Sequence, residues 1–262
     1  MILTADYHTH TTYSHGKGSV LDNAKVAEAK GLREIAISDH GFSHPAFGIT
    51  KKKVPVMRAD IDAVNQQVRP RVLMGIESNL LGESGAVDLK EKFYPYFDVF
   101  LVGFHKFIMY ESVKDWFTFF GKNFSTTKFH KKPSEKLIKL NTKAYIAAIE
   151  KHPVDVITHL NYCVFADAVE VAKAARDNGT YLELNAKKTH LTDEELYKVA
   201  ATGVKFVIGS DAHTPDRVGE ISLVESLLSR VEVPEEQIDN INGKLPDFRF
   251  QRYKREHGIE SY

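Results

Sequence analysis

The sequence predicts an α/β barrel in which about seven parallel strands alternate with helices. Short apolar runs that resemble strands are nearly all followed by helical patterns, and this alternation is typical of a parallel sheet. Side chains of the types that bind metals follow six of these runs. All strands of a closed barrel end at one face, whereas the strand ends of an open sheet lie along a line and could not share one pocket. The pattern therefore favours a closed barrel.

The first half of the chain carries clear signals for its elements. Ile2 and Leu3 lead into a first strand, and Ser19 and Gly31 are a suitable N-cap and stop for the first helix. Residues 41–55 are expected to form a loop, and 87–96 a short strand or turn followed by a short helix. The other elements expected here are strands at Glu34–Ser38, Arg71–Ile76 and Phe97–Phe104, and helices at Val20–Lys30 and Val56–Arg69.

The second half alternates more regularly. Ser134 is expected to cap a long amphipathic helix, and Thr192 with Glu195 forms a capping box. Expected strands are Val154–Ile157, Tyr181–Leu184 and Val204–Ile208, and expected helices are Lys136–Glu150, Ala166–Asn178, one from Thr192 to Gly203, and a last long one at Val218–Val231.

Composition fits one soluble domain spanning residues 1–262. Lys plus Arg number 35, as do Asp plus Glu, so no net charge would attract nucleic acid or an anionic membrane. The N-terminus shows no signal pattern, and no apolar run reaches transmembrane length. Cys163 is the only cysteine, so no internal disulfide can form, and a cytoplasmic location is the simplest expectation.

The metal-binding side chains occupy equivalent places in the chain. His8 and His10 stand where the first strand ends, and alternate residues of an extended chain point the same way. A His-x-His pair alone carries little weight in a chain with 12 histidines. The pair is joined by donors after the other strand-like runs, namely His40, Glu77, His105, His159, Asp211 and His213, with His15 closing the first motif. Such a set is hard to obtain by chance.

This set resembles the PHP (polymerase and histidinol phosphatase) family of metal-dependent hydrolases, from His8 to Glu220. The chain looks closest to the YcdX-like members, stand-alone PHP domains regarded as phosphatases. The resemblance implies a distorted, TIM-like (β/α)7 barrel with up to three metals. Asn161-Tyr162-Cys163 departs from the glycine- and proline-containing stretch usual after the fifth motif, and this departure bears on the substrate.

The resemblance also implies three metal positions. The first would be held by His8, His10, Glu77 and Asp211; the second by Glu77 as a bridge, with His105 and His159; the third by His15, His40 and His213. These nitrogen and oxygen donors suit two or three divalent ions of zinc, manganese or iron. Metals bridged by a carboxylate would activate water for attack on phosphorus, so Glu77 and Asp211 are also candidate catalytic residues.

Other residues have less certain roles. Arg217 is the candidate phosphate clamp, because its planar fork suits phosphate oxygens, with a surface salt bridge as the rival interpretation. Asp6 and Asp39 could orient imidazoles or make ordinary loop hydrogen bonds. Lys106 is a weaker phosphate candidate, since it should point away from its neighbour His105. The remaining histidines match no motif and are expected in surface loops: His44, His130, His152, His190 and His257.

The segment Ile108–Lys132 is unusual. It contains Trp116, several phenylalanines and several lysines, with little clear period. A structureless loop of this length is usually functional or a lid. We therefore expect an insertion at about residues 107–133 that forms a cap or rim on the metal face and governs substrate choice.

Three functions are consistent with these features. A phosphatase acting on a small-molecule or nucleotide phosphomonoester is the leading hypothesis, with histidinol phosphate as one candidate substrate that would favour an acidic or polar pocket. A non-catalytic metal-binding PHP module is the second. A different metal-assisted hydrolysis is the third, and it would call for a lysine at a strand end, where the sequence offers none. No membrane partner is expected, and a homo-oligomer stays open.

Overall fold

The computed structural model describes residues 1–262 and contains one sheet of seven parallel strands in chain order. The strands are β1 Ala5–Thr9, β2 Glu34–Ile37, β3 Arg71–Asn79, β4 Val99–Gly103, β5 Val156–Ile157, β6 Tyr181–Asn185 and β7 Phe206–Gly209. The bridge between Thr9 and Ala212 and a 2.8 Å hydrogen bond from His10 N–H to the Ala212 carbonyl connect the first and last strands. The predicted (β/α)7 barrel is therefore confirmed.

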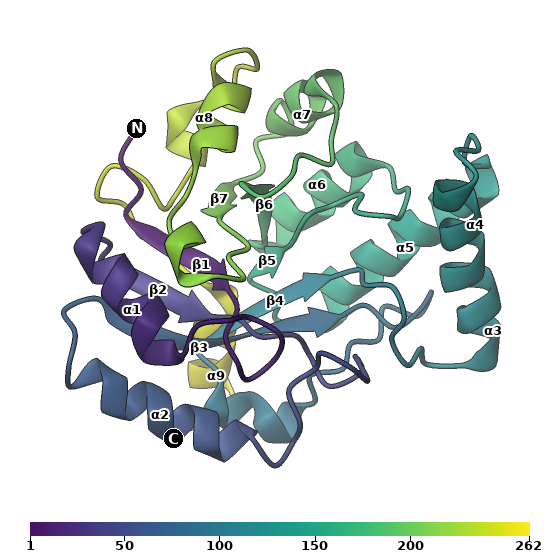
Figure 1. The fold of residues 1–262 in the computed structure, drawn as a ribbon. Coiled ribbons are helices and arrows are strands. Elements are labelled where there is room, and N and C mark those ends of the chain that lie inside the picture. Colours follow the sequence, from purple (N-terminus) through teal and green to yellow (C-terminus); the bar gives the residue numbers. More distant parts are fainter.

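Helices surround the strands (Figure 1). They are α1 Val20–Ala29, α2 Val54–Asn65, α3 Val113–Asp115, α4 Lys122–Lys128, α5 Glu135–Lys151, α6 Ala168–Asn178, α7 Asp193–Ala200, α8 Ser222–Leu228 and α9 Arg249–Glu256. The shorter helical segments are η1 Glu91–Tyr96, η2 Trp116–Gly121, η3 Pro215–Arg217 and η4 Glu235–Gln237. The capping box expected at Thr192 is present, and the expected N-cap Ser19 also forms a capping box, with Asp22. Ser134 accepts a hydrogen bond from Leu137 N–H at the start of α5. None of the helices has both the length and the hydropathy needed to span a membrane.

The side chains inside the barrel form successive layers along the strands. The lowest layer is apolar and separate from the larger core between strands and helices; it contains Ala5, Tyr7, Ala36, Leu73, Val99, Leu101, Val156, Tyr181, Val207 and Phe248. Two residues further along β3, β4 and β7 stands a glycine. A Cβ at Gly103 would lie 2.4 Å from Thr158 Oγ1, and one at Gly209 2.2 Å from Glu183 Oε1. This glycine layer leaves the space into which polar side chains extend at the barrel mouth.

Two regions differ from the prediction. Most of the segment Ile108–Lys132 is helical rather than an irregular loop, because α3, η2 and α4 follow one another without a break over residues 113–128, with six π-helical residues in the middle. Its aromatic side chains pack together, with Phe120 lying 5.6 Å from Phe107 and 5.4 Å from Phe124 between ring centroids. The segment lies at the right of Figure 1. Because its aromatic side chains pack against one another, their spacing is irregular and gives no helical period.

The second difference lies near the C-terminus. The expected helix at Val218–Val231 is shorter, because Gly219 adopts φ +66° and donates its N–H to Asp6 Oδ2 at 2.9 Å, so helix α8 begins only at Ser222. Helix α9 was not predicted. Phe248, just before it, packs edge-on against Tyr7 at 4.8 Å, so this segment covers the end of the barrel opposite the strand carboxyl ends.

Candidate metal centre

All nine predicted ligands meet at the carboxyl ends of the strands. Four clusters of three donors have ligating atoms within 4.8 Å of one another: His8–His10–Asp211, His8–Glu77–His159, His40–Glu77–His105 and His10–His40–His213. His15 is not in these clusters, but its ring stacks on His40 at 4.8 Å and lies 4.3 Å from His213. The three histidines predicted for the third position are therefore neighbours.

Glu77 lies at the middle of this assembly with an exposed fraction of 0%. Its Oε1 lies 2.6 Å from His159 Nε2 and 3.2 Å from His105 Nε2. Its Oε2 faces the opposite side, 3.4 Å from His8 Nε2 and 3.7 Å from His10 Nε2. The two carboxylate oxygens thus face different sets of imidazoles. His40 Nδ1 also approaches Oε2, at 2.8 Å, so the second set includes a residue predicted for the third position.

Buried polar atoms without a hydrogen-bond partner are concentrated in this assembly. Of 11 such side-chain atoms in the chain, seven belong to predicted ligands: His8 Nε2, both ring nitrogens of His10, His15 Nδ1, His40 Nδ1, Glu77 Oε2 and His159 Nδ1. An unpartnered buried polar atom costs about 1–3 kcal/mol, and such atoms are rare in native proteins. Two of these atoms, His40 Nδ1 and Glu77 Oε2, lie 2.8 Å apart but do not form a hydrogen bond. Metal ions would supply partners for the imidazole nitrogens that face Glu77 and Asp211, so the residues present fit divalent cations.

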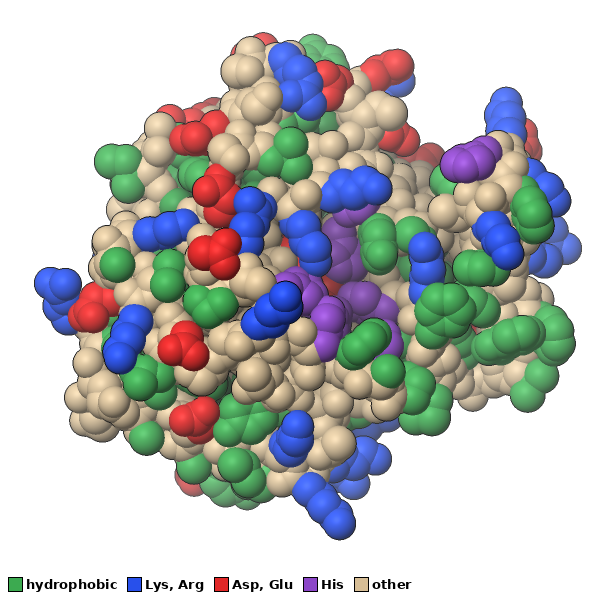
Figure 2. All heavy atoms as spheres, viewed as in Figure 1, with side chains coloured by type: hydrophobic (Ala, Val, Ile, Leu, Met, Phe, Trp, Pro, Cys, Tyr) green, Lys and Arg blue, Asp and Glu red, His purple; other side chains and the backbone are tan.

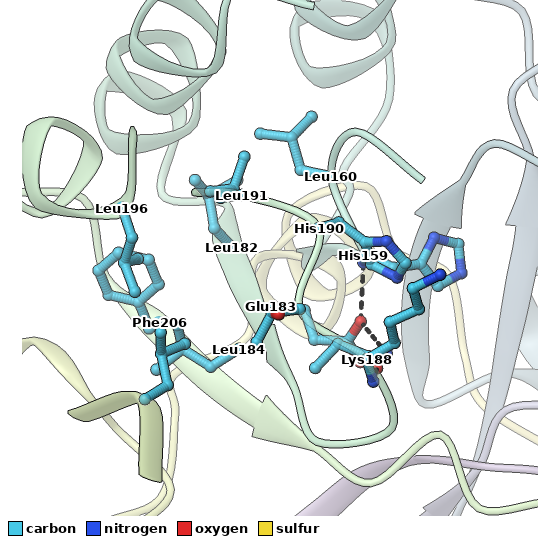
Figure 3. A pocket seen from close by; sticks show the side chains of 13 residues that line it. His159, Leu160, Leu182, Glu183, Leu184, Lys188, His190, Leu191, Leu196 and Phe206 are labelled. Carbon is cyan, nitrogen blue, oxygen red and sulfur yellow. Dashed lines mark hydrogen bonds between the residues drawn. The ribbon is translucent and has the colours of Figure 1, made fainter. Parts of the chain in front are cut away.

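Glu183 on β6 belongs to the site and was missed by the sequence analysis. Its Oε1 lies 2.6 Å from His8 Nδ1, while its Oε2 accepts from the His159 backbone N–H at 2.8 Å and from Asn185 Nδ2 at 2.9 Å (Figure 3). The His159 backbone has φ +30°, an unfavourable conformation for a residue with a Cβ, and Glu183 helps to hold it. A charged residue inside the apolar run Tyr181–Leu184 was the signal that could have revealed it.

Of the other residues that could orient an imidazole, Asp6 and Asp39 do not do so, whereas Asn79 does. Asp6 accepts only backbone N–H groups, from His8, Ser210 and Gly219. Asp39 hydrogen-bonds the backbone and hydroxyl of Thr11, and its Oδ1 is 3.9 Å from His10 Nδ1. Asp6 and Asp39 therefore make ordinary loop hydrogen bonds, which was one of the two roles considered for them. Asn79 does orient an imidazole, because its Oδ1 lies 2.8 Å from His105 Nδ1.

The electrostatic environment favours ligand-competent protonation states. Burial lowers the pKa of His15 to about 4 and that of His40 to about 3. Burial acts to raise the pKa of Glu77, but the imidazoles of His105 and His8 outweigh it and hold that pKa well below its ordinary value. His8 and His159 are exceptions. Burial acts to lower the pKa of both, but the carboxylates of Glu183 and Glu77 raise that of His8 well above 6.5, and Glu77 raises that of His159 above its ordinary value. Neutral imidazoles and ionised carboxylates are the forms that bind metals.

Seven of the nine predicted ligands line the floor of a cavity of about 600 Å³ that opens to solvent, and the other two, His8 and His10, are buried and do not line it. Figure 2 shows histidines in the depth of a hollow with lysine or arginine side chains around its mouth. The side chains that line it beyond the ligands are His44, Phe47, Lys106, Phe107, Tyr162, Lys187, Lys188 and His190.

Several expectations about the cavity wall need correction. Arg217 lies in η3 and does not line the cavity, so its proposed role as a phosphate clamp has no support in the geometry. Lys106 does line it, because the chain leaves the extended conformation after β4 and bends at Lys106 and Phe107. His44 and His190 also belong to the wall, although no motif marks them.

Comparison with known proteins agrees with this geometry. The pattern of the PHP domain matches residues 6–187. The chain belongs to the PHP family. This PHP protein is 30% identical over 269 residues to a protein of Acetivibrio thermocellus named a probable phosphatase, a match that covers 97% of this chain and 98% of the relative. It is 29% identical over 270 residues to a probable phosphatase of Caldanaerobacter subterraneus, covering 97% and 93% of the two chains.

A solved structure has the same fold as this PHP protein. It is the histidinol phosphate phosphatase of Lactococcus lactis complexed with zinc, L-histidinol and phosphate, with a TM-score of 0.59 and 14% identity over 94% of this chain and 100% of that one. At this identity the likeness concerns the fold alone. The family and the phosphatases among its relatives place the chain among the metal-dependent phosphoric ester hydrolases.

Proposed function

We propose that this PHP protein hydrolyses a small-molecule or nucleotide phosphomonoester at a centre of two or three divalent metals. The observation that supports this most strongly is that seven buried nitrogen and oxygen atoms of the predicted ligands have no hydrogen-bond partner. A set of loop histidines without a metal would be expected to satisfy one another or to reach water. The donors are all nitrogen and oxygen, which suits zinc, manganese or iron.

The division of contacts at Glu77 supports its role as a bridge. Oε1 would serve the second position with His105 and His159, and Oε2 the first position with His8 and His10. Asp211 would complete the first position, since its Oδ1 lies 3.4 Å from His10 Nε2 and 3.9 Å from His8 Nε2. His15, His40 and His213 would hold the third metal.

When bound, divalent metals activate water and neutralise charge on phosphoryl oxygens. The chain's own residues fix where this chemistry takes place. Glu183 and Asn79 orient the imidazoles of His8 and His105. Lys187 Nζ lies 3.2 Å from Asp211 Oδ1 and 3.1 Å from His213 Nδ1, at the rim, where an ammonium could also contact a phosphate oxygen. Phe107, fixed by Phe120 and Phe124, would form part of the rim expected for residues 107–133.

The alternatives are less well supported. A non-catalytic module would not need an open cavity beside the metals. A lysine-bridged hydrolase was set aside because no strand end offered a lysine, yet Lys187 follows β6 by two residues. Its side chain is 48% exposed at the rim, however, and the buried place between the imidazoles is filled by Glu77. A cytoplasmic location and a homo-oligomer stay predictions.

Elemental analysis combined with a phosphoester panel tests the proposal. The purified protein should carry two or three transition metals per chain and hydrolyse p-nitrophenyl phosphate, and removal of metal by a chelator should abolish turnover until metal is restored. Stoichiometric metal without turnover of any ester in a wide panel would reject the enzyme and favour the binding module.

A further inference from the structure

The outer wall of the cavity carries positive charge that the metal centre does not require. Lys106 follows β4 and Lys188 follows β6, and both line the cavity. Neither forms an ion pair with a carboxylate, whereas Lys187 is paired with Asp211. The Lys106 ammonium lies 5.7 Å from the ring centroid of Tyr162, a residue of the same wall.

The same wall offers no free negative charge. Glu77 and Asp211 are the only carboxylates lining the cavity, and both belong to the ligand set. Glu183 is buried behind His8, and its two oxygens are occupied by His8, His159 and Asn185. A cationic group of a substrate would therefore meet two unpaired ammonium groups and no carboxylate to pair with.

Space for such a second group is present. A cavity of about 600 Å³ is within the range of sites that enclose a small organic ligand, so an ester's alcohol part fits beside a phosphoryl group at the metals. His190 lies between the floor and the outer wall, with its ring 6.1 Å from that of His159 and 5.1 Å from that of Tyr162. Figure 3 draws an adjoining pocket that shares His159, Lys188 and His190 with this cavity, and there the Lys188 side chain lies near those two imidazoles.

We propose that Lys106 and Lys188, with Tyr162 and His190, form a subsite for a second anionic group on the alcohol part of the substrate. This inference rests on the proposed phosphatase function and narrows its substrate class to phosphomonoesters that also carry a carboxylate or a second phosphate. It argues against histidinol phosphate, whose alcohol part carries an ammonium group and would favour an acidic wall.

Three alkyl phosphomonoesters of similar size separate charge from other features: phosphoglycerate has an additional carboxylate, glycerol phosphate has no additional charge, and phosphoethanolamine has an ammonium group. The metal-loaded protein should show kcat/KM in the order phosphoglycerate, glycerol phosphate, phosphoethanolamine. A partly desolvated ammonium–carboxylate contact is worth about tenfold in affinity. The ratio of kcat/KM for phosphoglycerate to that for glycerol phosphate should therefore fall about tenfold in Lys106→Met and in Lys188→Met, through KM.

Lys139→Met is the matched control, because Lys139 is exposed on α5 and does not line this cavity. It should leave the ratio unchanged, and elemental analysis should show the same metal content in all four proteins. A wild-type protein that prefers phosphoethanolamine, or a Lys106→Met/Lys188→Met double variant with an unaltered ratio, would overturn the inference while leaving the phosphatase function intact. If no ester of the wider panel is hydrolysed by the metal-loaded protein, the proposed function fails, and the inference fails with it.

Discussion

Replacement of Glu183 by glutamine should weaken metal binding at His8 without unfolding the protein. In the native site the carboxylate accepts on both oxygens, from His8 Nδ1 at 2.6 Å, from the His159 N–H at 2.8 Å and from Asn185 Nδ2 at 2.9 Å. Glutamine offers only one accepting oxygen, because its other terminal atom is an NH2 donor. Either His8, or His159 and Asn185 together, must therefore face the NH2 group of the glutamine instead of an accepting oxygen.

The orientation of the new amide follows from the number of partners on each side. If its NH2 faced His159 and Asn185, two buried donors would lose their acceptor, at about 1–3 kcal/mol each. If its NH2 faced His8, only one contact would change, and His8 could adapt by accepting at Nδ1. The second orientation should therefore be preferred. It places the ring proton on Nε2, the atom that points toward Glu77 and Asp211 and has no hydrogen-bond partner.

A protonated Nε2 cannot bind a metal ion. Loss of an orienting partner typically lowers metal affinity about 10–100-fold, equivalent to about 1.4–2.7 kcal/mol. We expect a loss within this range for the metal nearest His8. The third position should be little affected, because Glu183 makes no contact with His15, His40 or His213.

Chelator competition measures the affinity, and nitrogen NMR of the His8 ring reports its tautomer. Glu34→Gln is the matched control, since Glu34 accepts from the Tyr7 hydroxyl at 2.7 Å at the start of β2 and glutamine retains an acceptor. Metal affinity within twofold of the wild type in Glu183→Gln, with the His8 proton still on Nδ1, would refute the reasoning.

Three further outcomes are expected. Glu77→Ala should deplete the metals of the first and second positions and lower turnover by orders of magnitude, whereas His15→Ala should mainly weaken binding of the third metal. Elemental analysis and turnover of the two variants test this, and full metal content with a near-normal rate in Glu77→Ala would contradict the bridging hypothesis. Phe107→Ala should alter the ranking of phosphoesters in a panel while metal content stays constant, because Phe107 is 63% exposed and lines the cavity. An unchanged ranking would mean that Phe107 and the helices next to it play no part in substrate choice. Because the lowered pKa values of His15, about 4, and His40, about 3, keep their imidazoles neutral, the third metal should be retained in dialysis from about pH 7 down to about pH 5.5. The first and second positions should lose metal earlier on acidification, because the pKa values of His8 and His159 are raised.

The barrel and the gathering of the candidate ligands at its mouth were predictable, because both depend on regular patterns. Strand-like runs end at donor residues, and the parity of a strand carries the side chains at alternate positions to one face. Leu73, Gly75 and Glu77 follow this rule along β3. The same parity applied to β6 would have placed Glu183 beside Tyr181 on the inner face, but a single glutamate in a short strand offers no motif to recognise.

Other features depend on contacts between distant segments and could not be foreseen. The helical form of residues 113–128 is stabilised by packing among aromatic side chains with irregular spacing, which masks any helical period. Helix α8 is shortened by a hydrogen bond from Gly219 to Asp6 at the other end of the chain. The direction of Lys106 depends on the bend of the chain at Lys106 and Phe107, a local departure from extended geometry that no spacing rule describes.

The glycine layer inside the barrel has a consequence for how this chain tolerates mutation. Gly209 does not line the cavity, yet an added methyl group would collide with the Glu183 carboxylate at 2.2 Å and crowd the His8 Cβ at 3.0 Å. At Gly103 the added methyl would collide with Thr158 and reach Glu77 Oε1 at 3.1 Å. A saturation screen selecting for activity should therefore find these two glycines as intolerant as the histidines above them. Changes of substrate preference should accordingly come from the loops around the mouth, because these two strand positions do not admit a larger side chain.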